Sequence, residues 1–344
     1  IGGNYPIIQR SDAQCEDLII EPRASLTLYD GYSIDVSNNI YINSDETGTG
    51  SFVDFNINDA VTIGNTIYVE QYLKPDKWSY ISSPLQNMPH NSITDSNCLS
   101  YNGNLIYYNE AYNTDYNQDG KIDWFDGWVW PWYYTHNNAP LLTGKGYAYY
   151  SGQYDCDRTI VLTGNNMRFN SGDVLVRVTN QDETAALDTI PQMKTRGWNL
   201  IGNPYPCAID ADVFLNYESN ATTLDATIYY WDENGEQGWF LDGRDYSTYN
   251  PSLGGTVGTG NGNIIPDKYI SINQAFFVHR TNTDLVGSNI VFINSMKNIE
   301  NSNFFKSNKI VKLPKIKLSL QNQNYYNESI IGFANDASAN QRNP

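Results

Sequence analysis

One segment of the chain occurs twice. Residues 78–84, WSYISSP, and residues 198–204, WNLIGNP, share a tryptophan, an isoleucine and a proline at the same spacing. Four ordered matches, counting this one, predict that residues 74–181 and 182–335 are two copies of one antiparallel β unit of the sandwich or jelly-roll kind. The offset grows slightly along the chain, as loop insertions would cause. The further pairs are NLIYYNE (104–110) with ATIYYWDE (226–233), LLTGKGYAYY (141–150) with SINQAFFVHR (271–280), and TIVLTG (159–164) with NIVFIN (289–294).

The duplication leads to two expectations about packing. Trp78 and Trp198 should lie on equivalent strands, each buried in the core of its own copy. The segments IKLSLQNQ and SIIGFAND read as strands, so residues 316–335 should complete the second sandwich. Residues 174–181 and 197–204 should likewise serve the first.

The segment before the copies has a different pattern. Short apolar strands recur every six to eight residues, separated by turn residues: LII (18–20), LTL (26–28), IDV (34–36) and IYI (40–42). Only Asp30-Gly31 has the form of a hairpin turn, which favours a β-helix-like stack over hairpins, with an ordinary meander as the alternative. With 27 tyrosines and 8 tryptophans, the composition suits half-buried pleated surfaces. We therefore predict an all-β chain: a short β-helix-like strand stack at residues 1–73, then the two copies, then a truncated tail at residues 336–344.

Charge and hydropathy exclude several classes of protein. The formal net charge of −17 is opposite to that of most nucleic-acid-binding proteins and suits a soluble extracellular protein. No run of 18 apolar residues is present, so no membrane span is predicted. The chain starts at Ile1, and we interpret it as a mature or excised fragment. The chain has four cysteines without CxxC spacing, so no zinc cluster is predicted: Cys15, Cys98, Cys156 and Cys207. They could form disulfides or remain buried free thiols.

Residues 113–126, NTDYNQDGKIDWFD, have the spacing of a calcium-binding loop. Carboxylate and amide oxygens fall at positions 1, 3, 5, 9 and 12 around a glycine at position 6, and position 7 offers a backbone carbonyl. The predicted Ca²⁺ ligands are Asp115, Asn117, Asp119, Lys121 (through its carbonyl), Asp123 and Asp126. Aspartate at position 12 resembles dockerin-type loops. The flanking segments read as strand rather than helix, so we predict an isolated loop inserted between two strands, with a metal-free polar turn as the alternative.

The calcium loop runs into an aromatic cluster, WFDGWVWPWYYTHN at residues 124–137. Aromatic faces can stack on sugar rings, so four side chains are candidates for glycan binding: Trp124, Trp128, Trp130 and Trp132. The alternative is a hydrophobic cluster that supports the loop, and we favour it for most of the rings because so many aromatic side chains rarely stay exposed.

Several of these segments also carry a family resemblance. ASLTLYDGYSIDV with INSDETGTGSFVD, then YVEQYLKPDKWSYISSPL, GWNLIGNPYPCAID and INQAFFVHRTN, resemble the region before the sorting tail of large Bacteroidota proteins exported by the type IX secretion system. The resemblance covers nearly the whole chain. It implies a β-rich, multi-module protein that is secreted or held at the cell surface, and a missing C-terminal tail as the contact with the secretion machinery. It implies no catalytic residues. Relatives commonly have serine where this chain has Cys207.

The sequence therefore favours a non-catalytic, calcium-stabilised structural or adhesive β module. A carbohydrate-binding module is the first alternative, and an accessory part of a polysaccharide-degrading enzyme is the second. Against an enzyme, the acid pairs Asp210/Asp212 and Asp232/Glu233 lie in turn-like contexts, and His279 lies in a strand, where packing is its expected role. A glycan or other cell-surface ligand is the predicted partner.

Overall fold

The computed structural model describes residues 5–74, 77–95, 104–109, 127–129, 140–150, 158–180, 197–232, 246–258, 264–281, 288–299, 315–321 and 326–332. The predicted all-β fold class is confirmed, because strands dominate and the only α-helices among these residues are two short ones. None of the described helices is long and apolar enough to cross a membrane.

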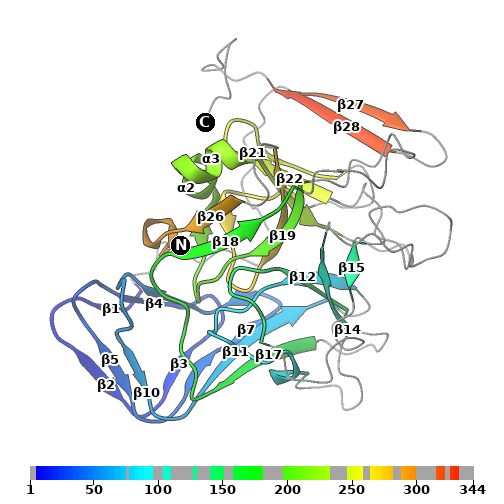
Figure 1. Cartoon of the computed structure of the whole chain (residues 1–344). Helices are drawn as coiled ribbons and strands as arrows, with labels where there is room; N and C mark the ends of the chain where they lie inside the picture. Colours follow the sequence, from blue (N-terminus) through cyan, green and yellow to red (C-terminus); the bar gives the residue numbers. More distant parts are fainter. Residues whose placement is uncertain are drawn as a thin grey trace.

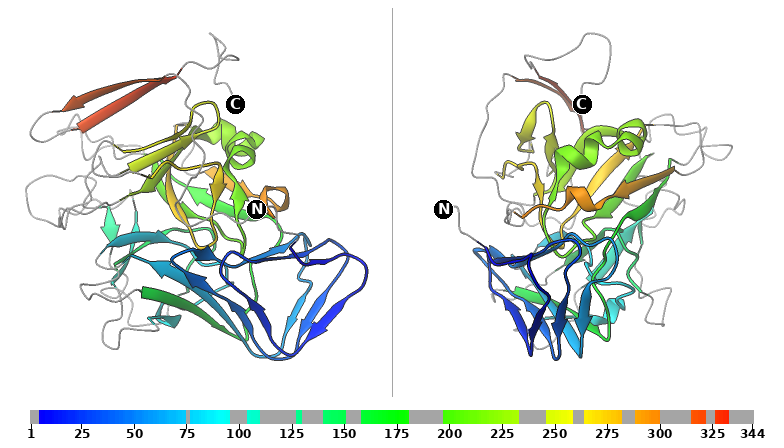
Figure 2. Two further views of the ribbon diagram at one scale, coloured as in Figure 1. Left: turned by 180° about the vertical axis from the view of Figure 1, so that it is seen from behind. Right: turned by 90° about the vertical axis from the view of Figure 1, so that its left-hand side faces the viewer.

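The first seventy residues form a parallel stack. Three ladders each contain three parallel strands, and each ladder takes one strand from every coil. The ladders form the three faces of a triangular prism, drawn in blue in Figure 1 and seen from behind in Figure 2. They are β1 (Ile7–Ile8), β4 (Ser25–Leu28) and β9 (Ser51–Asp54); β2 (Ala13–Cys15), β5 (Ile34–Val36) and β10 (Val61–Ile63); β3 (Leu18–Ile20), β6 (Ile40–Ile42) and β11 (Thr66–Leu73).

Alternation along these short strands explains the stack. In the second coil Leu28, Ile34 and Ile40 point inward and are buried, while Asp35, between two inward residues, is exposed. On the outer surface the rings of Tyr41 and Tyr68 stack at 5.0 Å, because parallel register places them side by side. A small hairpin of β7 (Ser44–Asp45) and β8 (Gly48–Thr49) packs beside β11, where the Tyr72 N–H donates to the Ser44 hydroxyl at 2.9 Å.

Strand β11 joins the stack to the rest of the molecule. One edge of β11 pairs in parallel with β6, and the other pairs along its whole length with antiparallel β17 (Arg158–Asn165). The other edge of β17 pairs with β13 (Ile93–Asp95), which follows the 3₁₀ turn η1 (His90–Ser92). One apolar cluster contains stack residues such as Ile67 together with Ile81 and Tyr147 of the first copy. The predicted boundary between residues 73 and 74 therefore does not separate two cores.

The two copies have the same strand order, which supports the predicted duplication. In each sheet the strand that begins at the repeated tryptophan pairs with the strand of the third matched segment, residues 147–150 or 275–280. The strand of the second matched segment, residues 104–108 or 224–231, lies next to it. The first sheet is β12 (Trp78–Ile81), β16 (Tyr147–Tyr150), β14 (Asn104–Tyr108) and β15 (Trp128–Val129). The second is β19 (Trp198–Gly202), β25 (Ala275–Arg280), β21 (Leu224–Trp231), β22 (Tyr246–Asn250) and β23 (Gly254–Thr256).

Structural equivalence differs by one residue from the sequence match. Ile81 pairs with Tyr147, and its equivalent Ile201 pairs with Phe276, whereas the sequence had matched Tyr147 with Phe277. A one-residue shift moves every side chain to the other face of the sheet. The register therefore decides which aromatic residues of the third strand face the partner copy.

The repeat also begins earlier than the sequence indicated. Strand β18 (Val174–Val178) pairs with β26 (Ser288–Phe292), as β11 pairs with β17. Residues 174–178 and 198–202 thus lie in sheets of the second copy, and the expectation that residues 174–181 and 197–204 would serve the first was wrong. The relation is hidden in the sequence because the distances from β11 to Trp78 and from β18 to Trp198 differ.

The copies are tied together by a reciprocal backbone exchange. The N–H of Ser82 donates to the carbonyl of Asn273, and the N–H of the equivalent Gly202 donates to the carbonyl of Gly144, both at 2.9 Å. Gly144 and Asn273 both have positive φ, 74° and 59°, so the same turn occurs in both copies. The two units therefore face each other with approximate twofold symmetry.

An inter-copy cluster fills the space between the two sheets. Its buried members are Tyr80, Ile106, Tyr108, Trp128, Ala148, Leu200, Trp231, Ala275 and Phe277. Trp78 and Trp198 lie on equivalent strands, but both are only half-buried and pack against this cluster. The expectation that each would be buried in its own core was wrong, because the repeated faces are covered by each other.

The second copy has a further core on its other face. Short helices α2 (Ala211–Asn216) and α3 (Glu218–Thr223) cover it, and the Phe214 ring stacks on Phe292 at 4.8 Å. Asp210 caps α2 by accepting from the N–H groups of Asp212 and Val213. Strands β20 (Ile209–Asp210) and β24 (Tyr269–Ile270) pair nearby, and the 3₁₀ turn η3 (Asn294–Met296) follows β26.

The C-terminal strands form a separate hairpin. Strands β27 (Lys315–Gln321) and β28 (Tyr326–Gly332), red in Figure 1, pair with each other and with no other described strand. Residues 315–321 and 326–332 therefore join no described strand of the second copy, and the expectation that residues 316–335 complete the second sandwich was wrong.

Candidate functional site

The predicted calcium ligands lie outside the described residues. The calcium site therefore stays a prediction for all six residues: Asp115, Asn117, Asp119, Lys121, Asp123 and Asp126. The residues on either side of the loop are described, and they form paired antiparallel strands, β14 and β15. The Asn109 N–H donates to the Gly127 carbonyl at 2.8 Å and closes the base of the loop. The expected placement of the insertion between two strands is therefore confirmed.

Gly127 is required by this closure. A Cβ there would lie 2.5 Å from the Tyr108 ring, so no larger residue fits without displacing it. Elsewhere in the described part of the chain, no group of three or more His, Cys, Asp or Glu side chains is arranged to hold a metal ion.

Of the four tryptophans proposed to bind glycans, only Trp128 is described, and Trp124, Trp130 and Trp132 lie outside the described residues. Trp128 is 5% exposed. Its ring centroid lies 5.4 Å from that of Tyr108, 5.8 Å from Tyr80 and 6.0 Å from Phe277. Its ring is therefore part of the inter-copy cluster and presents little surface to a ligand.

A pocket, here called the junction pocket, opens where the stack and both copies meet. The β7–β8 hairpin and the end of β11 form one wall, β12 forms the second, and the end of β21 with Ile264 and Gln274 forms the third. No single segment predicts this pocket, because its walls come from residues far apart in the sequence.

Asp232 is the buried carboxylate of the junction pocket. It is 4% exposed, and its Oδ2 accepts from the Ile264 N–H at 3.0 Å and the Ser247 hydroxyl at 3.4 Å. Burial raises the pKa of Asp232 from its ordinary value of 3.8, and these hydrogen bonds and the charges of Lys74 and Lys77 oppose the increase. The sequence pointed to Asp232 as one of an acid pair, and the structure places it beside two cations.

Two further groups in the pocket wall are buried and have no hydrogen-bond partner among the described residues. They are Oε1 of Gln274, a residue 3% exposed, and the indole N–H of Trp231, a residue 7% exposed. Buried polar atoms are nearly always satisfied in native proteins, so an acceptor and a donor left open in one pocket call for an explanation. Half-buried Tyr72 and Trp78 add aromatic surface beside them.

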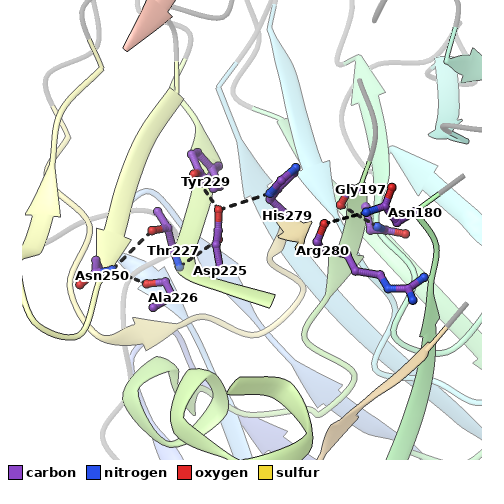
Figure 3. A network of polar contacts seen from close by, with 10 residues as sticks. Asn180, Gly197, Asp225, Ala226, Thr227, Tyr229, Asn250, His279 and Arg280 are labelled. Carbon is purple, nitrogen blue, oxygen red and sulfur yellow. Dashed lines mark hydrogen bonds and ion pairs between the residues drawn. The ribbon is translucent and has the colours of Figure 1, made fainter. Parts of the chain in front are cut away.

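A second polar cluster lies on the second copy (Figure 3). Asp225 Oδ2 accepts from the Tyr229 hydroxyl at 3.2 Å and lies 3.7 Å from His279 Nδ1. The His279 ring packs against Trp198 with centroids 4.9 Å apart. The His279 backbone pairs with that of Trp198 in the β19–β25 ladder. His279 therefore has a packing role, as expected.

The other residues weighed from the sequence have structural roles. Asp210 caps a helix and accepts from Lys268 Nζ at 2.9 Å, and Asp212 accepts from the Tyr249 hydroxyl at 2.7 Å. Cys15 and Cys207 are free thiols, and burial raises the pKa of the Cys207 thiol to about 12. Cys98 and Cys156 lie outside the described residues.

Comparison with known proteins gives one match. A family model, Domain of unknown function (DUF8693), matches residues 1–343. No curated protein and no solved structure matches the chain.

Proposed function

The chain belongs to the DUF8693 family, and we propose that it is a non-catalytic structural or adhesive β module of a large secreted or cell-surface protein. In this proposal calcium stabilises the module, and type IX secretion exports its parent through a C-terminal tail. Three observations support the proposal: the strongly negative net charge, the β-rich fold and the sequence resemblance to proteins exported by the type IX secretion system.

The continuity of the β structure carries the proposal. Strand β11 belongs both to the parallel stack and to the first copy. On a second face, the Phe52 N–H of the stack donates to the Pro206 carbonyl at 2.8 Å, and Lys297 Nζ donates to the Asp54 carbonyl. Force applied along the chain would thus be shared by ladders and a common core, which suits a spacer or adhesive module.

Secretion is tested in the native bacterium. The parent protein, detected by an antibody to this region, should be on the cell surface or in the medium of wild-type cells. It should be retained inside cells that lack a component of the type IX machinery. Equal surface levels in both strains would contradict export by this route.

Calcium binding is proposed for the loop between β14 and β15. Four carboxylates repel one another there without a cation, and Ca²⁺ prefers the oxygen ligands that the spacing offers. Chelator-stripped protein should bind one Ca²⁺ in calorimetric titration. Its stability should rise by about 2.7 kcal/mol at a hundred times the dissociation constant.

The calcium test has a matched control. Asp119→Ala should abolish the binding heat, while Asp225→Ala, which removes a carboxylate from the second copy, should leave it unchanged. Identical melts with and without EDTA, together with no binding heat, would show that the loop is a metal-free turn.

Glycan binding is the second candidate function. Its proposed site is the junction pocket rather than the aromatic cluster of residues 124–137. A sugar hydroxyl both donates and accepts, so a sugar ring can satisfy Gln274 Oε1, the Trp231 N–H and the Asp232 carboxylate together. Half-buried Trp78 offers a face for the apolar side of the ring. We propose a neutral saccharide as the ligand, because cations and carboxylates are mixed in the pocket walls.

The duplication supplies the control for this candidate. Trp78 lines the pocket, and its equivalent Trp198 does not. On a glycan array, Trp78→Ala should lose the bound saccharides and Trp198→Ala should keep them. No binding by the wild-type protein, or equal loss in both variants, would contradict the site.

A further inference from the structure

The first coil of the stack is less covered than the second. The inward side chains Ile8, Ala13, Cys15 and Leu18 are only half-buried. Their partners one coil further along, Leu28, Ile34, Val36 and Ile40, are 0 to 3% exposed. An apolar core is therefore open at this end of the prism.

The same end presents three strand edges. Strands β1, β2 and β3 are each at the edge of their sheet in the described structure, so one side of each strand pairs with no described strand. Unpaired edges of this kind invite another strand. At the other end, β11 pairs with β17 and β9 contacts the second copy, so two of the three ladders are covered there.

We propose that this open end is the docking surface for a further parallel coil, supplied by the polypeptide that precedes Ile1 in the parent protein. In all three ladders the stack order follows the chain order, so the position beyond the first coil is that of preceding residues. The register pairs Ile7 with Thr27 and Ile40 with Ile67, so a coil takes 20 to 27 residues.

A second copy of the chain fits the surface less well. The described residues of the first coil, 5–20, include exposed Asp12, Glu16 and Asp17 and one basic residue, Arg10, so two such ends would bring like charges together. Two copies related by a twofold axis would also set antiparallel strands against edges whose existing ladders are parallel.

Hydrogen exchange tests the proposal on two proteins: this 344-residue chain, and the parent chain extended upstream by about two coils. In the shorter protein the amides of β1, β2 and β3 should exchange faster than those of β4, β5 and β6. The extension should slow exchange in the first coil by about tenfold or more and leave the second coil little changed.

A substitution adds an independent readout. Ala13→Asp places a charge at a half-open position in the shorter protein and beneath a coil in the extended one, so it should lower the Tm far more in the extended protein. Ile34→Asp, one coil further in, should lower the Tm in both.

Three results would overturn the proposal. The first is an exchange pattern that the extension does not change. The second is protection of β1, β2 and β3 in the shorter protein that rises with protein concentration, which would identify a second copy as the occupant. The third is a parent chain with fewer residues before Ile1 than one coil requires.

Discussion

Burial sets the protonation behaviour of Asp232 more than its charged neighbours do. Because burial raises its pKa in the folded chain, protonation favours the fold. This stabilising effect of protonation is complete below pH 3.8, the ordinary pKa of an aspartate, and is lost as the pH rises through the folded-state pKa of Asp232. Burial likewise raises the pKa values of Asp54 and Asp267.

Replacement of Asp232 should therefore flatten the pH dependence of stability. Between about pH 4 and pH 7, the Tm of Asp232→Asn should fall less steeply than that of the wild type, because one raised pKa is removed. Thermal melts in a series of buffers measure this, with exposed Asp35→Asn as the control. A slope unchanged in Asp232→Asn would show that Asp232 titrates as a solvated carboxylate.

Asn203 is a buried amide of the repeated motif that makes four hydrogen bonds. Its Nδ2 donates to the carbonyls of Cys207 at 2.7 Å, Ser271 at 2.9 Å and Ile270 at 3.2 Å, and its Oδ1 accepts from the Tyr205 N–H at 3.0 Å. Its equivalent in the first copy, Ser83, accepts from the Leu85 N–H at 3.1 Å and so holds the same turn with fewer bonds.

This difference predicts unequal effects of two matched substitutions. Asn203→Ala should lower the free energy of unfolding by about 3 kcal/mol, because several buried backbone groups lose their partner, and Ser83→Ala should lower it by about 1 kcal/mol. Urea denaturation measures both. Equal losses would mean that water replaces the Asn203 amide.

At the scale of elements, the hairpin β27–β28 pairs with no other strand in the part of the chain that the structure describes. Its two strands form a sheet of their own. Deletion of residues 300–344 should therefore change the Tm by less than about 2 °C. Differential scanning calorimetry checks this, with deletion of residues 288–344, which also removes β26, as the destabilised comparison. A large loss from the shorter deletion would mean that the hairpin packs on the second copy after all.

At the scale of the whole molecule, the shared strand β11 couples the stack to the copies. We expect one cooperative unfolding transition, because the stack cannot open without breaking the β11–β17 ladder. No tryptophan lies in residues 1–73, so tryptophan fluorescence reports the copies while far-UV circular dichroism reports all strands. The two signals should coincide in urea, and separate midpoints would identify two independent domains.

Patterns in the sequence were enough to predict the all-β class, the strand stack, the order of repeated strands and the insertion of the loop between strands. These features follow from local properties: the alternation of apolar residues, turn chemistry and the spacing of a repeated motif. Each is encoded within a few adjacent residues, and the match of WSYISSP with WNLIGNP needed no knowledge of packing.

Which surfaces are covered could be seen only once the strands were packed together. Trp128 is buried because the second copy lies against it, and the one-residue register of β16 and β25 sets which aromatic side chains meet there. The junction pocket and the pairing of β18 with β26 depend on segments far apart in the chain. Burial is a property of two surfaces, and a local pattern describes only one of them.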